Sequence, residues 1–142
     1  MPNAFVTLLR VHQEIYDRSD GWVGHRLLFG MPSLLLRHVG RKTGAQRTSA
    51  LTYGRDGDNY LVVASNGGAS RSPAWLHNLT AQPDTEIQIG RTTVPVRARV
   101  VLPDDPGYER MWDTMNKVNH GNYRKYQEKT TRPIPVVELS PR

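Results

Sequence analysis

The chain has 142 residues, with 19 Lys and Arg against 13 Asp and Glu and a formal net charge of +6, a length that fits one domain with one core. Cysteine is absent, which excludes disulfides, thiolate catalysis and cysteine-based metal sites. No signal-peptide pattern and no run of roughly 20 apolar residues is present, so the sequence predicts a soluble, cytoplasmic protein.

The first 32 residues are predicted to be an N-terminal helical segment ahead of the main domain, residues 33–142. Between residues 5 and 17, apolar side chains recur at helical spacing and polar side chains occupy the other side. The apolar face is expected to dock on the core or on a second copy in a homodimer. The alternative is a peripheral membrane contact, because residues 22–31 add further apolar side chains.

The next third of the chain has the pattern of short strands. Residues 33–39, 48–54 and 60–65 are predicted as sequential antiparallel strands, the last two joined by a turn at 55–58. A helix is predicted over 73–81, with Ser72 as its N-cap and Pro73 at its first position.

The remaining elements are another hairpin, two helical segments and a last strand. Strands are predicted at 85–89 and 92–102, with Pro95 marking an edge or a bulge. Helical segments are predicted at 106–118 and 120–130, and a final strand at 134–139. Five or six short strands with interspersed helices indicate an α+β, mainly β fold, a small barrel or strongly curled sheet with helices over its ends.

The connection between the first two strands reads Gly-Arg-Lys-Thr-Gly-Ala-Gln-Arg over residues 40–47. Its glycines are turn residues, so Arg41, Lys42 and Arg47 gather around one loop. Guanidinium groups bind phosphate or carboxylate with paired hydrogen bonds and an ammonium acts as a point charge, so this combination suits a ligand with several negative groups. A solvated basic hairpin tip is the alternative.

A loop of small residues, 65–70, follows the third strand and precedes the helix at 73–81. Its amides could approach a planar ligand or an anion, and the alternative is an ordinary turn. In a meander of sequential strands, alternate turns lie at the same end of the sheet. This loop and the basic loop are therefore expected on one rim.

His120, Tyr123 and Tyr126 recur every third residue, which places their rings on one side of a helical segment. They either pack on the barrel or line a pocket in which they hydrogen-bond to a substrate or protonate it. Trp75 fits a core position, and His77 has no partner at metal-ligand spacing, so no metal is predicted. Basic and aromatic residues are not interleaved as in nucleic-acid-binding motifs, so nucleic acid is not an expected partner.

Four ordered motifs resemble the deazaflavin-dependent nitroreductase family, split β-barrel enzymes of the flavin-reductase and FMN-binding type that use coenzyme F420. The similarity runs over nearly the whole chain from about Leu34. The motifs are Gly-Arg-Lys-Thr-Gly at 40–44 with Arg47 and Leu51; Ala-Ser-Asn-Gly-Gly-Ala at 64–69; Pro73, Trp75, Asn78 and Leu79; and Arg132 with Ile-Pro-Val-Val at 134–137.

The resemblance implies which residues bind coenzyme F420, an 8-hydroxy-5-deazaflavin. It places the phosphate and the acidic tail on Arg41, Lys42 and Arg47. The other implied cofactor-binding residues are Thr43, Thr48, Ser49, Ala50, Leu51, Thr52, Val63, Ala64, Ser65, Asn66, Ala74, Trp75, Leu76, His77 and Asn78. The implied catalytic residues, which line the substrate pocket, are Tyr123, Tyr126 and His120.

The resemblance further implies an oxidoreductase that transfers a hydride from reduced coenzyme F420 to a small-molecule electron acceptor. Four positions depart from the usual family residues, namely Ala50, Thr52, Asn66 and His120. Because several of them lie in the pocket, the acceptor is expected to be a quinone, an enone or a nitroaromatic compound. Two alternatives stay open: an FMN-dependent split-barrel reductase, and a non-catalytic flavin- or ligand-binding protein.

Overall fold

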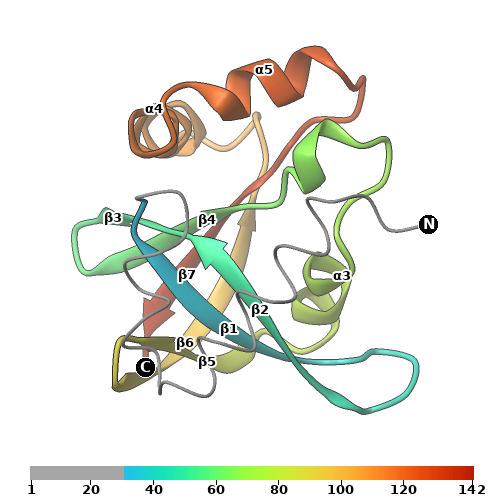
Figure 1. Cartoon of the computed structure of the whole chain (residues 1–142), viewed down its shortest axis with the longest axis vertical. Coiled ribbons are helices and arrows are strands. Elements are labelled where there is room, and N and C mark those ends of the chain that lie inside the picture. The colour runs from blue at the N-terminus through green and yellow to red at the C-terminus, as the bar shows by residue number, and fades with distance from the viewer. Residues whose placement is uncertain (1–30) are drawn as a thin grey trace.

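A curled antiparallel sheet forms the body of the computed structural model, which describes residues 31–142 (Figure 1). The predicted helix at 5–17 and the apolar residues that follow it, except Met31, lie outside the described residues. Within those residues the sheet has seven strands in the order β2-β1-β5-β6-β7-β4-β3. Their bounds are β1 Ser33–Val39, β2 Gln46–Thr52, β3 Gly54–Asp56, β4 Asn59–Val63, β5 Asp84–Ile89, β6 Thr92–Val101 and β7 Val136–Pro141.

Strand β1 is an interior strand of the sheet whose leucines are buried on both faces. It pairs along its whole length with β2, from Ser33 opposite Thr52 to Val39 opposite Gln46, and with β5 on its other side. Leu34, Leu35 and Leu36 are all fully buried. A continuous apolar run of this kind is what a strand covered on both faces requires.

The prediction of three sequential antiparallel strands is half correct. Strands β1 and β2 pair, and β3 pairs with β4, but β2 and β4 belong to opposite edges of the sheet. Strand β4 pairs instead with β7, with Val62 opposite Val137. Strand β2 still contacts β4 across the gap between the edges, which makes the sheet a half-barrel. This confirms the predicted mainly β, split-barrel fold.

The predicted strand at 48–54 is two strands that belong to different parts of the sheet. Strand β2 ends at Thr52 and β3 begins at Gly54, where the chain passes from one edge of the sheet to the other. A Cβ on Gly54 would lie 2.7 Å from the Met115 sulfur, so only glycine permits this approach to the helix above it. The β3–β4 turn is also shorter than predicted, since Asp56 pairs with Asn59.

The second hairpin matches its prediction closely. Strands β5 and β6 pair from Asp84 opposite Arg97 to Ile89 opposite Thr92. Pro95 lies just before the stretch of β6 that pairs with β7, which begins at Val96. Proline has no N–H to donate to a further strand, so its position at the limit of that pairing agrees with the predicted edge.

Helix α3 (Ala74–Ala81) closes one end of the half-barrel (Figure 1). Its N-cap is Pro73 and no side chain caps it, so the prediction of Ser72 as the N-cap is wrong. Trp75, Leu76 and Leu79 belong to the same core cluster as Leu36. Burial of each such side chain contributes about 1.5–3 kcal/mol, which fixes α3 against the open end of the sheet.

Helices α4 (Tyr108–Val118) and α5 (Asn122–Glu128) lie together on the other side of the sheet (Figure 1). The buried residues of α4 recur at helical spacing, at Tyr108, Met111, Trp112 and Met115. They form a second core with side chains of β4, β6 and β7. The predicted helical segment at 120–130 is shorter at both ends, because His120 has a φ of 62° and lies in the turn before α5.

Candidate coenzyme site

The β1–β2 loop is a compact turn that presents its cations to solvent. The Gly40 N–H donates to the Ala45 carbonyl at 2.8 Å and the Gly44 N–H to the Gly40 carbonyl at 2.7 Å. A Cβ on Gly40 would lie 2.8 Å from the Thr43 hydroxyl oxygen and 3.2 Å from the Arg47 Nε, so this glycine lets the two side chains fold over the turn. Residues 41–47 are all exposed.

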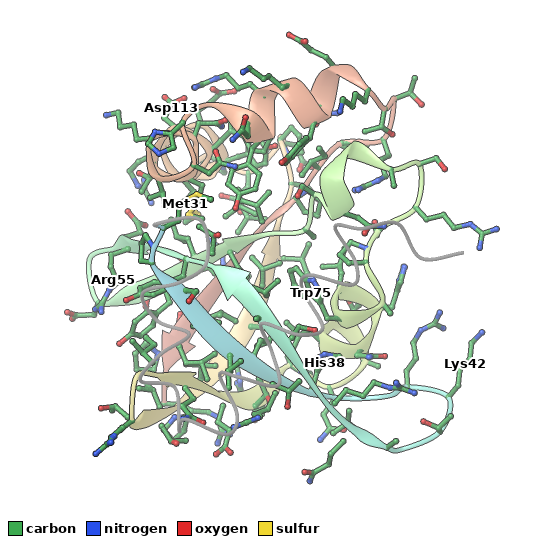
Figure 2. The ribbon with its side chains drawn as sticks, in the orientation of Figure 1. Met31, His38, Lys42, Arg55, Trp75 and Asp113 are labelled. Carbon is green, nitrogen blue, oxygen red and sulfur yellow. The ribbon has the colours of Figure 1, made fainter. Side chains whose placement is uncertain are left out.

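The three cations of this loop are not neutralised by carboxylates. Among residues 31–142, the side chains of Arg41, Lys42 and Arg47 form no ion pair. Figure 2 shows Lys42 at the tip of the loop, pointing away from the body of the protein. Other arginines of the described chain do have carboxylate partners, namely Arg97, Arg99, Arg110 and Arg124. The loop therefore offers three positive charges to an anionic ligand.

Asn78 of α3 holds this loop against the helix. Its Oδ1 accepts a hydrogen bond from the Arg41 backbone N–H at 3.0 Å, and its Nδ2 lies 2.9 Å from Nδ1 of His38. The other ring nitrogen of His38 lies 2.9 Å from the Ser49 hydroxyl of β2. Asn78 and His38 are both 5% exposed, so this polar chain is buried at the end of the sheet.

The β4–α3 loop, which contains the 3₁₀ turn η1 (Asn66–Gly68), is the second part of the site. Asn66, Gly67 and Gly68 have φ values of 45°, 65° and 83°. Two glycines are needed here because L side chains rarely adopt positive φ. Ser65 is buried at the start of the loop, whereas Asn66 is exposed and donates from Nδ2 to the Arg71 carbonyl at 3.0 Å.

The Arg132 side chain fixes the shape of the β4–α3 loop. Its guanidinium donates from Nη2 to the Ser65 carbonyl at 2.7 Å, from Nε to the Ala69 carbonyl at 2.9 Å and from Nη1 to the Ala64 carbonyl at 3.3 Å. Burial lowers the pKa of Arg132 from its ordinary value. With three carbonyl oxygens as acceptors, the guanidinium retains its charge beneath the loop.

Helix α5 is the third part of the site, because it packs directly on η1. A Cβ on Gly68 would lie 2.6 Å from the Tyr126 carbonyl oxygen. Tyr126 is half-buried, and its ring contacts the Tyr123 ring edge-on, with centroids 6.2 Å apart. The β4–α3 loop thus lies between α3 on one side and α5 on the other.

Tyr123 is a core residue with a protonated hydroxyl. It is 7% exposed and packs on Trp112. Burial raises the pKa of Tyr123 well above its ordinary value, and the neighbouring Tyr126 raises it further. Its hydroxyl forms no hydrogen bond with any residue of the described chain, so it is a neutral donor available to another group. His120 is exposed and does not share the α5 face, so the predicted row of three rings is reduced to two.

The remaining predicted residues divide between the surface and the core. In β2, residues 48–52 are all half-buried and alternate in direction, so that Ser49 contacts His38 while Thr48 accepts a hydrogen bond from Arg37 at 2.8 Å. Trp75 and Leu76 belong to the core, as do Val63 and Ala64. Ala74 and His77 are exposed on α3. The structure thus joins the basic loop to α3 through the hydrogen bond between Arg41 and Asn78, and the small-residue loop leads directly into α3. The meander of three sequential strands, from which a shared rim was predicted, is not present, because β2 and β4 belong to opposite edges of the sheet.

His38 is the residue of this region that the sequence prediction missed. Its position in the sequence is nevertheless informative, because His38 follows three leucines and an arginine in a strand whose other buried side chains are mostly apolar. A titratable side chain in such a strand is a candidate for a buried polar role.

The described residues, 31–142, contain no group of three or more His, Asp or Glu side chains able to hold a metal ion. None of their helices has the length and apolar character needed to cross a membrane.

A half-barrel sheet with α3 and a basic hairpin at one end, and with a small-residue loop packed on an aromatic helix, is typical of a cofactor-binding oxidoreductase of the split-barrel class. The chain belongs to the F420H(2)-dependent quinone reductase family, whose model matches residues 8–141. It is therefore an oxidoreductase whose reductant is reduced coenzyme F420, and of the predicted acceptor classes the quinone is the one that the family supports.

Individual relatives agree with this family. The chain is 52% identical to the F420H(2)-dependent quinone reductase Rv1261c of Mycobacterium tuberculosis over 137 residues, 96% of this chain and 92% of that protein. A solved structure of an F420-H2 dependent reductase, FDR-A, superposes with a TM-score of 0.68 at 31% identity, covering 77% of this chain and 94% of that one. A second structure, described as a domain-swapped dimer, has a TM-score of 0.71 at 26% identity and covers 96% of this chain and all of that one.

Proposed function

We propose that the end of the half-barrel formed by the basic loop, the β4–α3 loop and α3 is the coenzyme F420 site of this protein. The observation that supports it most directly is the group of three loop cations, Arg41, Lys42 and Arg47, without carboxylate partners in the described chain. Coenzyme F420 carries a phosphate and an acidic tail, and arginine and lysine bind such groups through charge-assisted hydrogen bonds.

The half-buried strand β2 and the loop at Ser65 and Asn66 are the surfaces proposed to flank the deazaflavin ring. The ring requires a flat, close approach of backbone, which the exposed Gly67, with open space around its Cβ position, permits. Arg132 holds the loop carbonyls in place so that the loop is preformed. Trp75 and Asn78 contribute through the helix that they anchor.

When bound, reduced coenzyme F420 supplies the hydride that reduces the acceptor. This chain's own residues orient the acceptor and exchange a proton with it. We propose that a quinone lies against α5, where the Tyr123 hydroxyl donates a hydrogen bond to a quinone oxygen. The raised pKa of Tyr123 supports this role, because the phenol stays protonated at neutral pH. Tyr126 provides an aromatic wall, and His120 lies at the exposed end of the same region.

The coenzyme site is tested by titration of the protein with coenzyme F420 and with FMN, followed by tryptophan fluorescence. The variant Arg41→Ala/Lys42→Ala is expected to lose about 100-fold in coenzyme affinity, because each charge-assisted hydrogen bond contributes roughly 1.5–3 kcal/mol. The difference in coenzyme affinity between this variant and wild type should become smaller as the salt concentration is raised. A matched control is Arg55→Ala/Arg91→Ala, which removes the same charge from two other exposed positions, one in β3 and one in the turn between β5 and β6.

Arg55 lies on the opposite side of the molecule from Lys42 in Figure 2, so the control variant should retain wild-type affinity. Equal losses in the two double variants would show that only net charge matters and would overturn the proposed site. Tighter binding of FMN than of coenzyme F420 would favour the FMN-dependent alternative. Binding without turnover of any quinone would favour a ligand-binding protein.

The acceptor site has its own test. Tyr123→Phe is expected to lower kcat for a quinone such as menadione by about 10- to 100-fold, the effect of one hydrogen bond made in the transition state, while coenzyme affinity stays unchanged. An unchanged kcat would remove Tyr123 from the reaction and leave it a core residue.

Two further predictions concern partners and are separate from the site. The apolar face of residues 5–17 is expected to dock on the core or on a second copy in a homodimer, and a peripheral membrane contact is the alternative. Light scattering after size-exclusion chromatography measures the first, and sedimentation with anionic lipid vesicles measures the second.

A further inference from the structure

His38 is a buried imidazole that neither the hydride donor nor the acceptor site uses. It lies near the end of β1, the strand that leads directly into the basic loop. Two elements contact its ring, β2 through Ser49 and α3 through Asn78. Because the ring is 5% exposed and satisfied by protein on both sides, its protonation state is coupled to the positions of its neighbours.

The hydrogen-bond network determines which ring nitrogen carries the proton. The Arg41 backbone N–H can only donate, so the Asn78 atom that faces it is the oxygen Oδ1. The Asn78 NH₂ group therefore faces His38 and donates to Nδ1, which must be unprotonated. The proton of the neutral ring is then on Nε2, from which it is donated to the Ser49 hydroxyl oxygen.

We propose that neutral His38 is a positioning residue for coenzyme binding, which orients the Asn78 amide so that its oxygen holds the Arg41 backbone and with it the basic loop. This inference rests on the proposed coenzyme site. The bond from Arg41 joins the loop to α3, whereas the backbone bonds at Gly40 and Gly44 only close the loop on itself. Without the acceptor at His38, the Asn78 amide is free to rotate and the loop loses its attachment.

A charged His38 is incompatible with this arrangement. A proton on Nδ1 would face the Asn78 NH₂ group, and rotation of that amide would instead place NH₂ against the Arg41 N–H. One pair of donors would oppose each other in either case, in a buried position where an unmade hydrogen bond is costly.

The charges around His38 favour the neutral ring. Burial, and secondly the positive charge of Arg47, lower the pKa of His38 from its ordinary value of 6.5. Arg37, Glu86 and Arg142 line the same groove as His38 and Arg47, from β1, β5 and the residue after β7, so three positive charges and one negative charge line that groove. On α3 the facing group is the uncharged Asn78 amide. At neutral pH the ring is therefore uncharged, and the network is expected to fail only in acid.

Three variants test the inference. His38→Leu removes the acceptor, and coenzyme F420 affinity is expected to fall about tenfold, the effect of one net hydrogen bond, with kcat at saturating coenzyme changed less than about twofold. His38→Gln restores an acceptor and a donor and should recover most of the affinity, while it abolishes the loss of affinity that the wild type shows in acid. Thr80→Ala on the same helix is the matched control, because the Thr80 hydroxyl bonds to the Leu76 carbonyl and to no other described residue.

Two readouts do not depend on the coenzyme. The imidazole ¹⁵N shifts of the wild type are expected to report a neutral ring with the proton on Nε2. Amide hydrogen exchange at Arg41 is expected to be faster in His38→Leu than in wild type or Thr80→Ala, and slow again in His38→Gln.

The outcomes separate the two proposals. A wild type that binds no coenzyme F420 would overturn the proposed coenzyme site, whatever the exchange results. A wild type that binds, with His38→Leu matching Thr80→Ala in affinity and in Arg41 exchange, would overturn the role of His38 alone. A proton on Nδ1, or a charged ring at neutral pH, would also overturn it, and this measurement holds even if His38→Leu fails to fold.

Discussion

Gly68 and Tyr126 meet backbone to backbone: a Cβ on Gly68 would lie 2.6 Å from the Tyr126 carbonyl oxygen and 3.1 Å from its Cα. This contact joins the small-residue loop of the proposed coenzyme site to the helix that carries Tyr123. The close approach leaves no space for a side chain, and neither partner is a flexible side chain that could move aside. The close packing of the β4–α3 loop on α5 thus depends on the absence of a Cβ at residue 68.

Gly68→Ala is therefore expected to destabilise the protein by about 3 kcal/mol, from the overlap with Tyr126 and from the φ of 83°. Gly67→Ala is the control, since Gly67 has a φ of 65° but open space around its Cβ position. It is expected to lose only about 1 kcal/mol. Chemical denaturation of both variants measures the difference, and equal losses would show that backbone strain alone operates.

Arg132→Met should loosen the β4–α3 loop, because the guanidinium serves the carbonyls of Ala64, Ser65 and Ala69. The expected loss is about 2 kcal/mol of stability, with faster amide exchange over residues 65–70. Arg132→Lys should restore little of it, since a single ammonium cannot span three acceptors as a planar fork does.

The comparison variant for Arg132 is Arg124→Met. Arg124 pairs with Asp113 at the surface, with both side chains more than half exposed, and such pairs contribute little. If Arg124→Met destabilised the protein as much as Arg132→Met, the effect would come from loss of positive charge and not from the carbonyl contacts.

Tyr108→Phe should cost about 1–3 kcal/mol, because the buried Tyr108 hydroxyl donates to the Ile134 carbonyl at 2.6 Å and the variant leaves that carbonyl unpaired. Burial raises the pKa of Tyr108 to about 12, consistent with a hydroxyl kept from water. Thermal unfolding of Tyr108→Phe and Tyr60→Phe makes the comparison. The Tyr60 hydroxyl forms no hydrogen bond with described residues, so the second variant is expected to be nearly neutral.

The pair between Arg110 and Asp56 predicts a pH dependence of stability. Arg110 donates to both Asp56 oxygens, at 3.1 and 2.9 Å, and these hydrogen bonds lower the pKa of Asp56 from its ordinary value of 3.8. A carboxyl group with a lowered folded-state pKa stabilises the protein above its unfolded pKa. That contribution is lost as pH falls through the lowered value.

Asp56→Asn should therefore be less stable than wild type at pH 6 by less than about 1 kcal/mol, because Arg110 is well exposed. The difference should shrink as pH falls below the ordinary pKa of 3.8 and vanish once pH lies below the lowered pKa of Asp56, where the wild-type carboxyl group is itself neutral. Melting temperatures measured from pH 2.5 to pH 7 test this. A difference that stays constant from pH 7 to pH 2.5 would mean that wild type and Asp56→Asn differ for a reason other than charge.

Local features of this protein could be predicted from its sequence. The hairpin of β1 and β2 needs only a leucine-rich strand, two glycines and a second strand, all within 20 residues. Helix α3 follows from its apolar spacing after a proline, although the cap was assigned one residue too early. The basic loop was evident for the same reason, because three cations within seven residues stay together whatever the rest of the fold does.

The contacts between distant segments were decided by the tertiary structure alone. Nothing near Val62 specifies a partner at Val137, and the pairing of β4 with β7 follows only when all strands compete for hydrogen bonds and burial in one sheet. The role of Arg132 depends on three carbonyls more than 60 residues earlier in the chain. His38 becomes a positioning residue only because α3 places Asn78 beside it, 40 residues later in the chain. Residue types and local spacing thus determined which ligand-binding groups this chain contains. Burial and the pairing of distant segments decided which of those side chains are exposed to a ligand and which hold the structure together.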